Sequence, residues 1–374
     1  MRVPFANFRR AVDELRPELD AAVARVLDSG WFLLGREGEQ FEGELASWVG
    51  TSHAAGCASG TDAIELILRA AGIGEGDEVV TQANTCVPTV AAIVRAGATP
   101  VLCDVEPDAG TIDPASLERA LSPRTRAVVP VHLYGQIGDV EAVVAIARKH
   151  AIDVIEDCAQ AHGAAAGGRA AGTIGRAGAF SFYPTKNLGA FGDAGAVATS
   201  DPELDERVRL VRQYGQADRY RHVAEGVNSR LDEIQAALLR VRLAHLDAGN
   251  ARRIAIAEHY AEALGGSPVE PLRRLPGRTH VFHLFVVKAP DRERFQAALE
   301  ERGVATLVHY PRPVHGHPPY EALGRGPVPL TNAEELSERV VSLPIYPELT
   351  DAEVEHVAAA AREAAHEGAP AARG

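Results

Sequence analysis

Short apolar segments alternate with amphipathic segments through the first half of the chain. The apolar segments have the length of buried strands, and apolar residues recur every three to four positions in the segments between them. The predicted strands cover 78–82, 99–105, 127–135 and 153–158, and the predicted helices cover 61–73, 87–98, 116–121 and 140–151. This alternation favours right-handed crossovers and a mainly parallel sheet with helices on both faces. We therefore expect an α/β fold that binds its ligands beyond the carboxyl ends of the strands.

Two further helices are predicted on either side of this alternating region. Residues 11–28 place apolar side chains at helical spacing, and Ser29-Gly30 ends that helix. The connection that follows, 31–34, is unusually apolar, so it either packs under the fold or meets a partner. A long amphipathic helix begins with 230–247 and continues past Gly249.

The last third of the chain has the pattern of a second, smaller α/β lobe. It comprises a strand, a helix, a loop rich in proline and histidine, and a final helix, at 280–289, 292–303, 309–320 and 351–365. We expect a large domain over 1–248 that includes the N-terminal helix, a small domain over 249–366, and a disordered tail over 367–374.

Composition narrows the class of protein. A formal net charge of −13 over 374 residues disfavours nucleic acid or an anionic membrane as a partner. The four cysteines have no zinc-ligand spacing, so we predict buried free thiols in a reducing compartment and no metal site. The first residues lack the apolar core of a signal peptide, and no apolar stretch reaches the length of a membrane span. We expect a cytoplasmic protein.

The segment Ser59-Gly60-Thr61 joins a predicted strand to a predicted helix. Gly60 lets a ligand approach the backbone, and the first amide groups of the helix have no partner within it. Together with the helix dipole they form an anion site that suits a phosphate group. The alternative is a plain Ser/Thr helix cap with a turn glycine.

A second group of polar residues follows the strand at 153–158. It comprises Glu156, Asp157, Gln160 and His162. A carboxylate opposite a pyridine nitrogen keeps that ring protonated and makes it an electron sink, and Gln160 could bond a ring oxygen. The alternative is an acidic cap on the next loop, and His162 taken singly is a structural residue. Glu156, a neighbour of Asp157 on a strand, is expected to face the other way and to be dispensable for chemistry.

The segment FSFYPTKNLGAFGDAGA places a lysine where a surface charge is not expected. Lys186 follows Pro184 and is surrounded by apolar and small residues. Burial of this kind keeps an amine neutral and nucleophilic. Ser181 can add a hydroxyl to a phosphate site. The alternative is a lysine on a loop that extends its amine to solvent. Together, the three segments supply a phosphate site, a carboxylate and a reactive lysine on successive strand ends.

With these motifs the chain resembles fold-type I enzymes that use pyridoxal 5'-phosphate (PLP), and among them the DegT–StrS type sugar aminotransferases. The resemblance runs from VPFANF near residue 3 to the region of residue 354. Its strongest pieces are SGTDA (59–63), VHLYGQ (131–136), EDCAQAHGA (156–164), FSFYPTKNLGAFGDAGA (180–196), NSRLDEIQAA (228–237), HYPRPVHGHPPY (309–320) and SLPIYP (342–347). The resemblance implies an α/β PLP-dependent transferase fold with a smaller C-terminal α/β domain.

The resemblance also implies roles for individual residues. Lys186 would form the Schiff base with PLP and then carry the proton, and Asp157 would face the pyridine nitrogen. The cofactor phosphate would be bound by Thr61, Ser181 and the backbone of Gly60 and Asp62. Gln160 would reach the ring oxygen and Ala159 one ring face.

Two further implications concern the second ring face and the second subunit. The family normally stacks an aromatic residue on the ring after a threonine, but this chain has Cys86 after Asn84-Thr85. Asn228 would reach the cofactor phosphate of a neighbouring subunit, so a homodimer with shared active sites is implied.

The implied reaction moves an amino group from L-glutamate to a keto-deoxyhexose attached to a nucleoside diphosphate. NSRLDEIQAA and HYPRPVH most resemble the branch that acts at carbon 3 of a dTDP-3-keto-6-deoxyhexose, as in amino-sugar biosynthesis for antibiotics or polysaccharides. Relatives acting at carbon 4, or on cyclitol ketones, share most other motifs. The candidate substrate-binding residues are Trp31, Phe32, Tyr183, His309, Tyr310, His315 and Tyr320.

Three other functions fit these residues less well. A PLP-dependent dehydratase of this fold replaces the lysine by histidine, whereas Lys186 is present here. A regulatory protein that binds PLP and sugar without turnover would not need Lys186, Asp157 and Ser181 together. An unrelated α/β binding protein would carry no covalently bound cofactor.

Overall fold

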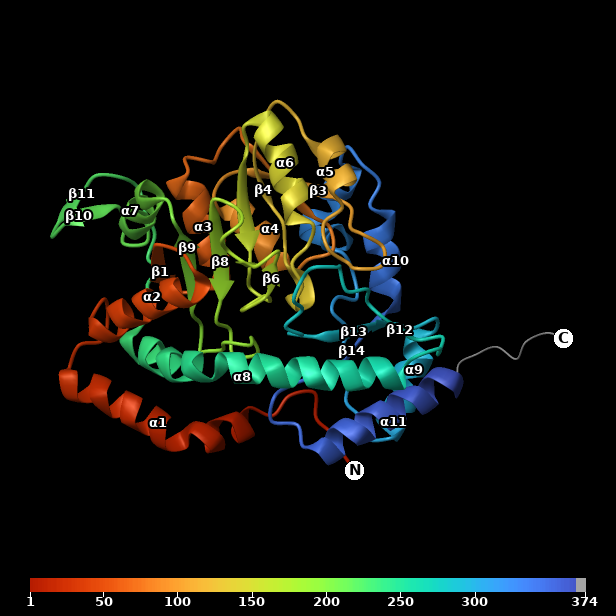
Figure 1. Cartoon of the computed structure of the whole chain (residues 1–374). Coiled ribbons are helices and arrows are strands. Elements are labelled where there is room, and N and C mark those ends of the chain that lie inside the picture. Colours follow the sequence, from red (N-terminus) through yellow and green to blue (C-terminus); the bar gives the residue numbers. More distant parts are fainter. Residues whose placement is uncertain (368–374) are drawn as a thin grey trace.

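A seven-stranded sheet forms the centre of the computed structural model, which describes residues 1–367 (Figure 1). The strands lie in the order β1-β9-β8-β5-β4-β2-β3, and only β9 runs antiparallel to its neighbours. Their bounds are β1 (His53–Cys57), β2 (Glu78–Gln82), β3 (Thr99–Cys103), β4 (Thr125–Val129), β5 (Asp153–Asp157), β8 (Ala177–Ser181) and β9 (Gly195–Thr199). The predicted mainly parallel sheet is confirmed.

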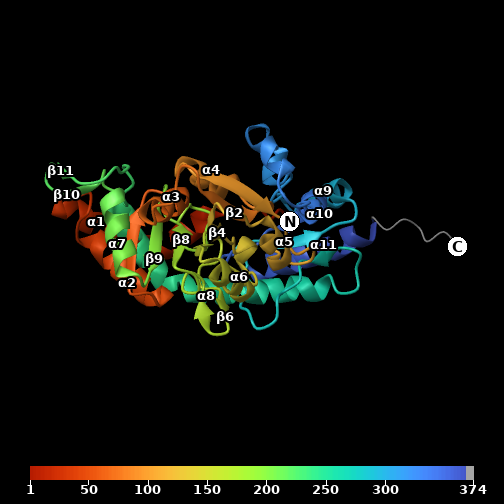
Figure 2. The same cartoon turned by 90° about the horizontal axis from the view of Figure 1, so that it is seen from above.

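Successive side chains of the strands point to opposite faces of the sheet and pack against two different layers of helices. Figure 2 shows helices on both sides of the sheet. In β5, Val154 packs into one layer and Ile155 into the other. One layer contains α3 (Gly60–Ala70), α4 (Val87–Arg95) and α7 (Pro202–Val211). The other contains α2 (Arg36–Val49), α5 (Pro114–Ala120), α6 (Val140–His150) and α8 (Glu233–Ala263). Helices therefore cover both faces of the sheet. The carboxyl ends of the strands remain as the place where a ligand can bind.

A second core surrounds a three-stranded antiparallel sheet and the C-terminal half of α8. Leu239 of α8 packs in the first core and Tyr260 in the second, so the helix crosses the predicted boundary after residue 248 without a break. Val3 also lies in the second core, where it pairs with Val304. The division into domains stays a prediction. The elements of this region are β12 (Glu270–Pro271), β13 (Phe285–Lys288), α9 (Arg292–Glu301), η2 (Val314–Gly316), η3 (Pro318–Arg325), α10 (Thr331–Arg339), β14 (Val340–Leu343) and α11 (Asp351–Glu367).

The structure differs from the predicted elements in a few places. The segment 127–135 is not one strand: β4 ends at Val129, since Pro130 has no amide hydrogen to donate, and η1 (Leu133–Gly135) follows. Helices α2, α7 and α10 were not predicted. Glu367 is the last residue of α11, and the rest of the predicted tail, 368–374, lies outside the described residues. The remaining elements are α1 (Phe8–Ser29), β6 (Ala165–Ala166), β7 (Arg169–Ala170), β10 (Gln216–Asp218) and β11 (Arg221–His222).

Within residues 1–367, no helix is both long enough and apolar enough to cross a membrane. Helix α8, with 31 residues, has the length, but charged side chains recur along it. It instead runs past the end of the seven-stranded sheet, and it contacts α1, α2 and α11 (Figure 1).

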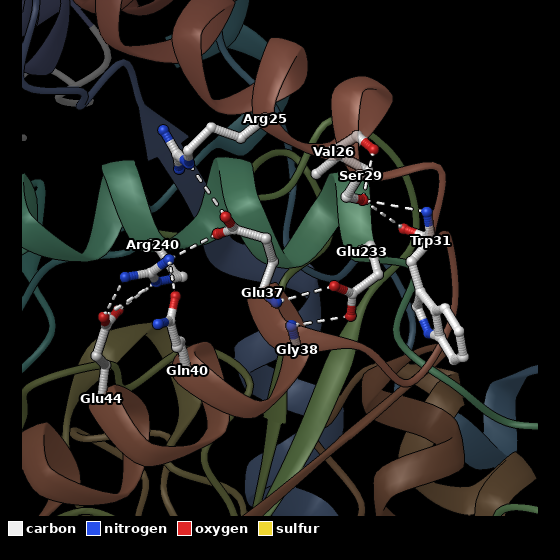
Figure 3. Close-up of polar contacts among 10 residues, drawn as sticks. All are labelled: Arg25, Val26, Ser29, Trp31, Glu37, Gly38, Gln40, Glu44, Glu233 and Arg240. Atoms are coloured by element: carbon white, nitrogen blue, oxygen red, sulfur yellow. Dashed lines mark hydrogen bonds and ion pairs between the residues drawn. The ribbon is translucent and has the colours of Figure 1, made fainter.

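The carboxylate of Glu233 at the start of α8 fixes the N-terminal elements to the fold (Figure 3). It accepts the backbone amides of Gly35, Glu37 and Gly38 at 2.9, 2.8 and 2.9 Å. These are among the amides that a helix leaves free at its N-terminus, here that of α2. In return, the Glu233 amide donates to the Phe32 carbonyl at 3.0 Å, so the apolar connection 31–34 is attached to α8.

Arg240, two turns further along α8, extends this attachment (Figure 3). Its guanidinium donates to Glu37, Gln40 and Glu44 of α2. Arg25 of α1 also donates to Glu37, at 3.1 Å. The three helices are thus joined by one polar network next to the exposed Trp31.

We predict that Glu233→Gln lowers the free energy of unfolding by about 1–3 kcal/mol. The side-chain nitrogen of glutamine is a donor, so at least one backbone N–H group that now bonds the carboxylate would lose its acceptor. Chemical denaturation measures the change. Glu44→Gln is the matched control, since it weakens a half-exposed ion pair with Arg240 and should shift the unfolding free energy by less than about 1 kcal/mol. Equal losses from both substitutions would contradict the role of Glu233.

Candidate active site

A cavity of about 280 Å³ lies at the carboxyl ends of β1, β5 and β8. The predicted cofactor residues, apart from Asp62 and Asn228, line it. The full lining is Ser59, Gly60, Thr61, Ile64, Thr85, Cys86, Pro88, Thr89, Val131, Asp157, Ala159, Gln160, Ser181, Tyr183, Lys186, Asp193 and Ala194. Three segments far apart in sequence therefore meet at the predicted edge of the sheet.

The first turn of α3 and the end of β8 form one wall of this cavity. A Cβ on Gly60 would lie 2.5 Å from the Cβ of Ser181, so only glycine fits at this point of contact. A Cβ on Gly195 would likewise lie 2.3 Å from the Ser59 carbonyl carbon. This close packing places the hydroxyl-bearing Thr61 and Ser181 beside the N-terminus of α3, where an anion is favoured.

Asp62 is arranged differently from its neighbours. Its backbone amide donates to the Ser59 hydroxyl at 3.1 Å, which is the helix cap. Its carboxylate accepts from Ser229 at 2.8 Å and pairs with Arg95 at 3.0 Å. The carboxylate is thus engaged with residues outside the cavity lining, whereas the amide bonds Ser59, which belongs to the lining. A contribution of this amide to phosphate binding would require it to exchange its partner.

Asp157 is buried at the end of β5, with 4% of its surface exposed. One carboxylate oxygen accepts from the Thr89 hydroxyl at 2.8 Å, and the other accepts from the Ala159 amide at 3.1 Å. Thr89 is itself bonded to the Thr85 hydroxyl at 3.0 Å. Burial raises the pKa of Asp157, and the hydrogen bonds from Ala159 and Thr89 oppose that shift. A cation placed against this carboxylate would be strongly stabilised.

Lys186 occupies the turn after β8, and its backbone amide donates to the Tyr183 carbonyl at 2.8 Å. The turn is tight, because a Cβ on Gly189 would lie 2.4 Å from the Pro184 carbonyl oxygen. Burial lowers the pKa of the Lys186 amine, although the Asp157 carboxylate partly opposes that change. A larger fraction of the amine is therefore neutral and able to act as a nucleophile.

Gln160 is held in one orientation between two tyrosines. Its side-chain oxygen accepts the Tyr134 backbone amide at 2.7 Å, and its side-chain nitrogen donates to the Tyr310 hydroxyl at 3.2 Å. Tyr134 adopts the left-handed backbone conformation, with φ of 63°. The second hydrogen of the Gln160 amide group remains for a ligand in the cavity.

Glu156 faces away from the cavity, as predicted, but it is not a bystander. Its buried carboxylate bonds His132 at 2.8 Å and accepts the amides of Gly172, Ile174 and Gly175 at 3.1, 2.7 and 2.7 Å. Burial alone would raise its pKa, but these bonds outweigh burial and lower it. The expectation that Glu156 is dispensable therefore needs revision: its substitution would disturb the support of β5.

Four predicted residues lie nearer the surface. Tyr183 lines the cavity and is 53% exposed, whereas Trp31 and Phe32 are exposed on the connection between α1 and α2. Asn228 is also exposed, pairs with Gln213, and does not line the cavity of its own chain. Binding of Asn228 to the cofactor phosphate of a second subunit therefore stays a prediction.

The residues predicted from the loop 309–320 are spread over three environments. Tyr310 contacts Gln160, as described. The ring of His309 bonds the Ser342 hydroxyl at 2.8 Å and lines a neighbouring cavity. His315 bonds Glu334 at 3.0 Å, and Tyr320 packs against the main core in η3. His315 and Tyr320 line neither cavity.

Sequence reasoning missed the residues that hold the predicted ones in place. Thr89 lies in the first turn of α4, and Thr85, which bonds it, precedes the N-cap residue Cys86, so no regular helical spacing marked the pair. Asp193 also lines the cavity, although it was quoted only as part of the segment FSFYPTKNLGAFGDAGA. No local signal marks the Tyr134 amide as the partner of Gln160.

The sequence and the structure of this chain are similar to those of known proteins. Residues 13–362 match the model of the DegT/DnrJ/EryC1/StrS aminotransferase family. A dTDP-3-amino-3,4,6-trideoxy-alpha-D-glucose transaminase of Streptomyces venezuelae is 49% identical over 97% of this chain and 96% of that protein. A dTDP-3-amino-3,6-dideoxy-alpha-D-galactopyranose transaminase of Aneurinibacillus thermoaerophilus is 45% identical over 95% and 97%.

Solved structures give the same grouping. The S. venezuelae DesV structure in complex with a ketimine intermediate superposes with a TM-score of 0.94 at 49% identity, over 97% of this chain and 98% of that chain. The Bacillus subtilis NtdA structure with bound cofactor PMP has a TM-score of 0.90 at 31% identity, over 98% and 85%.

We predict that Asp157→Asn changes the pH dependence of stability in the cofactor-free protein. The ordinary pKa of this carboxyl is near 3.8, and burial raises it in the folded state, so ionisation of Asp157 opposes folding above that pH. Asparagine carries no such penalty. The stability of the variant relative to wild type should therefore rise as the pH increases from acidic toward neutral values, as measured by denaturant unfolding. A difference independent of pH would contradict the raised pKa.

Proposed function

The chain belongs to the DegT/DnrJ/EryC1/StrS aminotransferase family, and from that membership we propose that it moves an amino group from L-glutamate to a keto-deoxyhexose linked to a nucleoside diphosphate. The proposed acceptor is carbon 3 of a dTDP-3-keto-6-deoxyhexose. Support comes from the relatives, of which several are named as transaminases of 3-amino sugars. A cytoplasmic location and a homodimer are part of the same proposal.

Pyridoxal phosphate is the cofactor of this family, and the residues of the cavity fit it. The fit rests on Gly60, which lets the first turn of α3 pack against Ser181 beside the cavity, and on the buried Asp157 carboxylate, which forms no ion pair with a lysine, arginine or histidine within residues 1–367. When bound, pyridoxal phosphate accepts the amino group and spreads the developing negative charge into its ring.

The roles that we propose follow the geometry of the cavity. Thr61, Ser181 and the first turn of α3 bind the phosphate, and Asp157 bonds the pyridine nitrogen. Gln160 donates to the ring oxygen, while Ala159 and Cys86 border the two ring faces. Because Cys86, the N-cap residue of α4, is smaller than an aromatic side chain, it would cover less of the cofactor than an aromatic residue would.

Lys186 has two proposed roles. Its amine, whose pKa burial lowers, would hold the cofactor covalently at the aldehyde position, with release of water. When released from that bond, the same amine would act as the acid and base that removes and returns a proton during the transfer. The single observation that carries the proposal is that this amine and the Asp157 carboxylate line one cavity.

The nucleotide sugar would approach over the exposed side of this cavity. We propose that Tyr183 and Tyr310 contact the sugar, since Tyr183 lines the opening and Tyr310 touches Gln160. Trp31 and Phe32, exposed on their anchored connection, would meet the nucleotide of a neighbouring subunit.

A regulatory protein without turnover is the second candidate. One relative, 48% identical over 96% of this chain, is named the erythromycin biosynthesis sensory transduction protein EryC1 of Saccharopolyspora erythraea. A binding-only function would not need a lysine with a lowered pKa beside a carboxylate with a raised one, so we favour the enzyme.

We predict that borohydride attaches the cofactor to Lys186 alone. The chain has three lysines, and the other two, Lys149 and Lys288, form ion pairs with Glu118 and Asp108. Peptide mass mapping of the reduced protein locates the added mass. Cofactor mass on Lys149 or Lys288 would refute the assignment.

We predict that Asp157→Asn retains the cofactor but slows both half-reactions on the order of 10²–10³-fold, by analogy with removal of one preorganised electrostatic contact. Thr89→Val keeps the carboxylate and removes one of its hydrogen bonds, so a smaller loss is expected. Single-turnover absorbance changes of the cofactor measure both. A turnover near the wild-type value in Asp157→Asn would show that another residue faces the ring nitrogen.

The homodimer makes a separate prediction. Asn228→Ala should weaken retention of the cofactor, because the residue would bind the phosphate in the neighbouring subunit. A hybrid of Lys186→Ala and Asn228→Ala subunits contains one undamaged site, so mixing the two variants at a low cofactor concentration should give more activity than either variant has alone. An active wild-type monomer in sizing experiments would exclude shared sites.

A further inference from the structure

The turn between β1 and α3, residues 58–62, is held on two sides. On the side of the sheet it packs against β8 through Gly60. On the other side it bonds Ser229, which lies between β11 and α8 and outside the cavity lining. The Ala58 amide donates to the Ser229 hydroxyl at 3.1 Å, and that hydroxyl donates to the Asp62 carboxylate at 2.8 Å. One side chain thus joins both ends of the turn.

Ser229 is itself fixed to the fold. It is almost fully buried, and its backbone amide donates to the Arg212 carbonyl at 2.9 Å. The Arg212 guanidinium in turn bonds the Gly56 carbonyl of β1 and the Glu42 carboxylate of α2, both at 2.6 Å. The hydroxyl that bonds the turn is therefore anchored to the same strand from which the turn emerges.

Asp62 brings a negative charge into the first turn of α3. The helix N-terminus attracts anions, so this carboxylate and a bound phosphate would compete for the same positive field and repel each other. The carboxylate is bonded elsewhere: one oxygen accepts from Ser229, and the other pairs with Arg95 at 3.0 Å. Neither Ser229 nor Arg95 lines the cavity. The charge of Asp62 is therefore compensated from outside, and the N-terminus of α3 is left to a ligand of the cavity.

We propose that Ser229 is a positioning residue for the cofactor phosphate, and that it acts by holding the turn 58–62 and the Asp62 carboxylate. The inference rests on the function proposed above, in which the first turn of α3 binds that phosphate. Because Ser229 does not line the cavity, it acts only through the turn. Its effect on binding should therefore depend on the phosphate of the cofactor and on the charge of Asp62.

The test compares pyridoxal phosphate with pyridoxal, which lacks the phosphate. Absorbance titration measures the affinity of each for the full-length protein freed of cofactor. Ser229→Ala removes the hydroxyl. Ser116→Ala is the matched control, since Ser116 is also buried and its hydroxyl accepts the Asp104 amide at 2.9 Å, but it does not line the cavity.

In Ser229→Ala the affinity for pyridoxal phosphate should fall about 10-fold, because the Ala58 amide loses its acceptor and the Asp62 carboxylate loses a donor. The affinity for pyridoxal should stay at the wild-type value, and Ser116→Ala should change neither affinity. Asp62→Asn removes the charge that Ser229 compensates. Adding Ser229→Ala to Asp62→Asn should therefore cost less affinity for pyridoxal phosphate than Ser229→Ala costs alone.

Equal losses of affinity for pyridoxal phosphate and pyridoxal in Ser229→Ala would overturn the inference, since they would show a general structural role. Unchanged affinity for pyridoxal phosphate, or the same loss with and without the Asp62 charge, would overturn it as well.

If Ser229→Ala does not fold, Arg95→Gln decides the outcome, because Arg95 is half-exposed and compensates the same carboxylate. The affinity for pyridoxal phosphate alone should then fall, and an equal fall for pyridoxal, or no fall, would contradict the inference. A wild-type protein that binds pyridoxal as tightly as pyridoxal phosphate would refute the phosphate site of the proposed function, and this inference with it.

Discussion

Burial of two ionisable groups in one cavity is the constraint on which the site depends. Desolvation moves the pKa of Asp157 up and that of Lys186 down, so each charged form is disfavoured until a partner arrives. A cationic ring nitrogen is such a partner for the carboxylate, and a carbonyl carbon is one for the neutral amine. The hydrogen bonds from Thr89 and Ala159 keep the carboxylate in place without neutralising it.

The fold provides this burial through the edge of its sheet. Strands β1, β5 and β8 end at one edge, and glycines at positions 60 and 195 allow α3 to press against β8. Behind β5, Glu156 binds four donors and so fixes the strand that carries Asp157. The two neighbours on β5 therefore have different tasks. Asp157 faces the cavity, and Glu156 makes the hydrogen bonds that hold the strand in place.

Much of this was predictable from sequence, because strand ends and motif residues are local features. The alternating pattern predicted the parallel sheet, and Lys186, Asp157, Gln160 and Ser181 were identified by residue type and position. Thr89 was not, since its bond to Asp157 arises from a contact between distant segments. Glu233 was quoted only as part of a motif, because nothing local shows that its carboxylate binds the first turn of α2.

The most direct test of the account is the protonation state of the cofactor's pyridine nitrogen. With ¹⁵N-labelled pyridoxal phosphate, the nitrogen chemical shift in the wild-type holoenzyme should be that of a protonated ring across neutral pH, because the Asp157 carboxylate stabilises the cation. In Asp157→Asn it should be that of a neutral ring. The same shift in both proteins would contradict the claim that this carboxylate governs the chemistry.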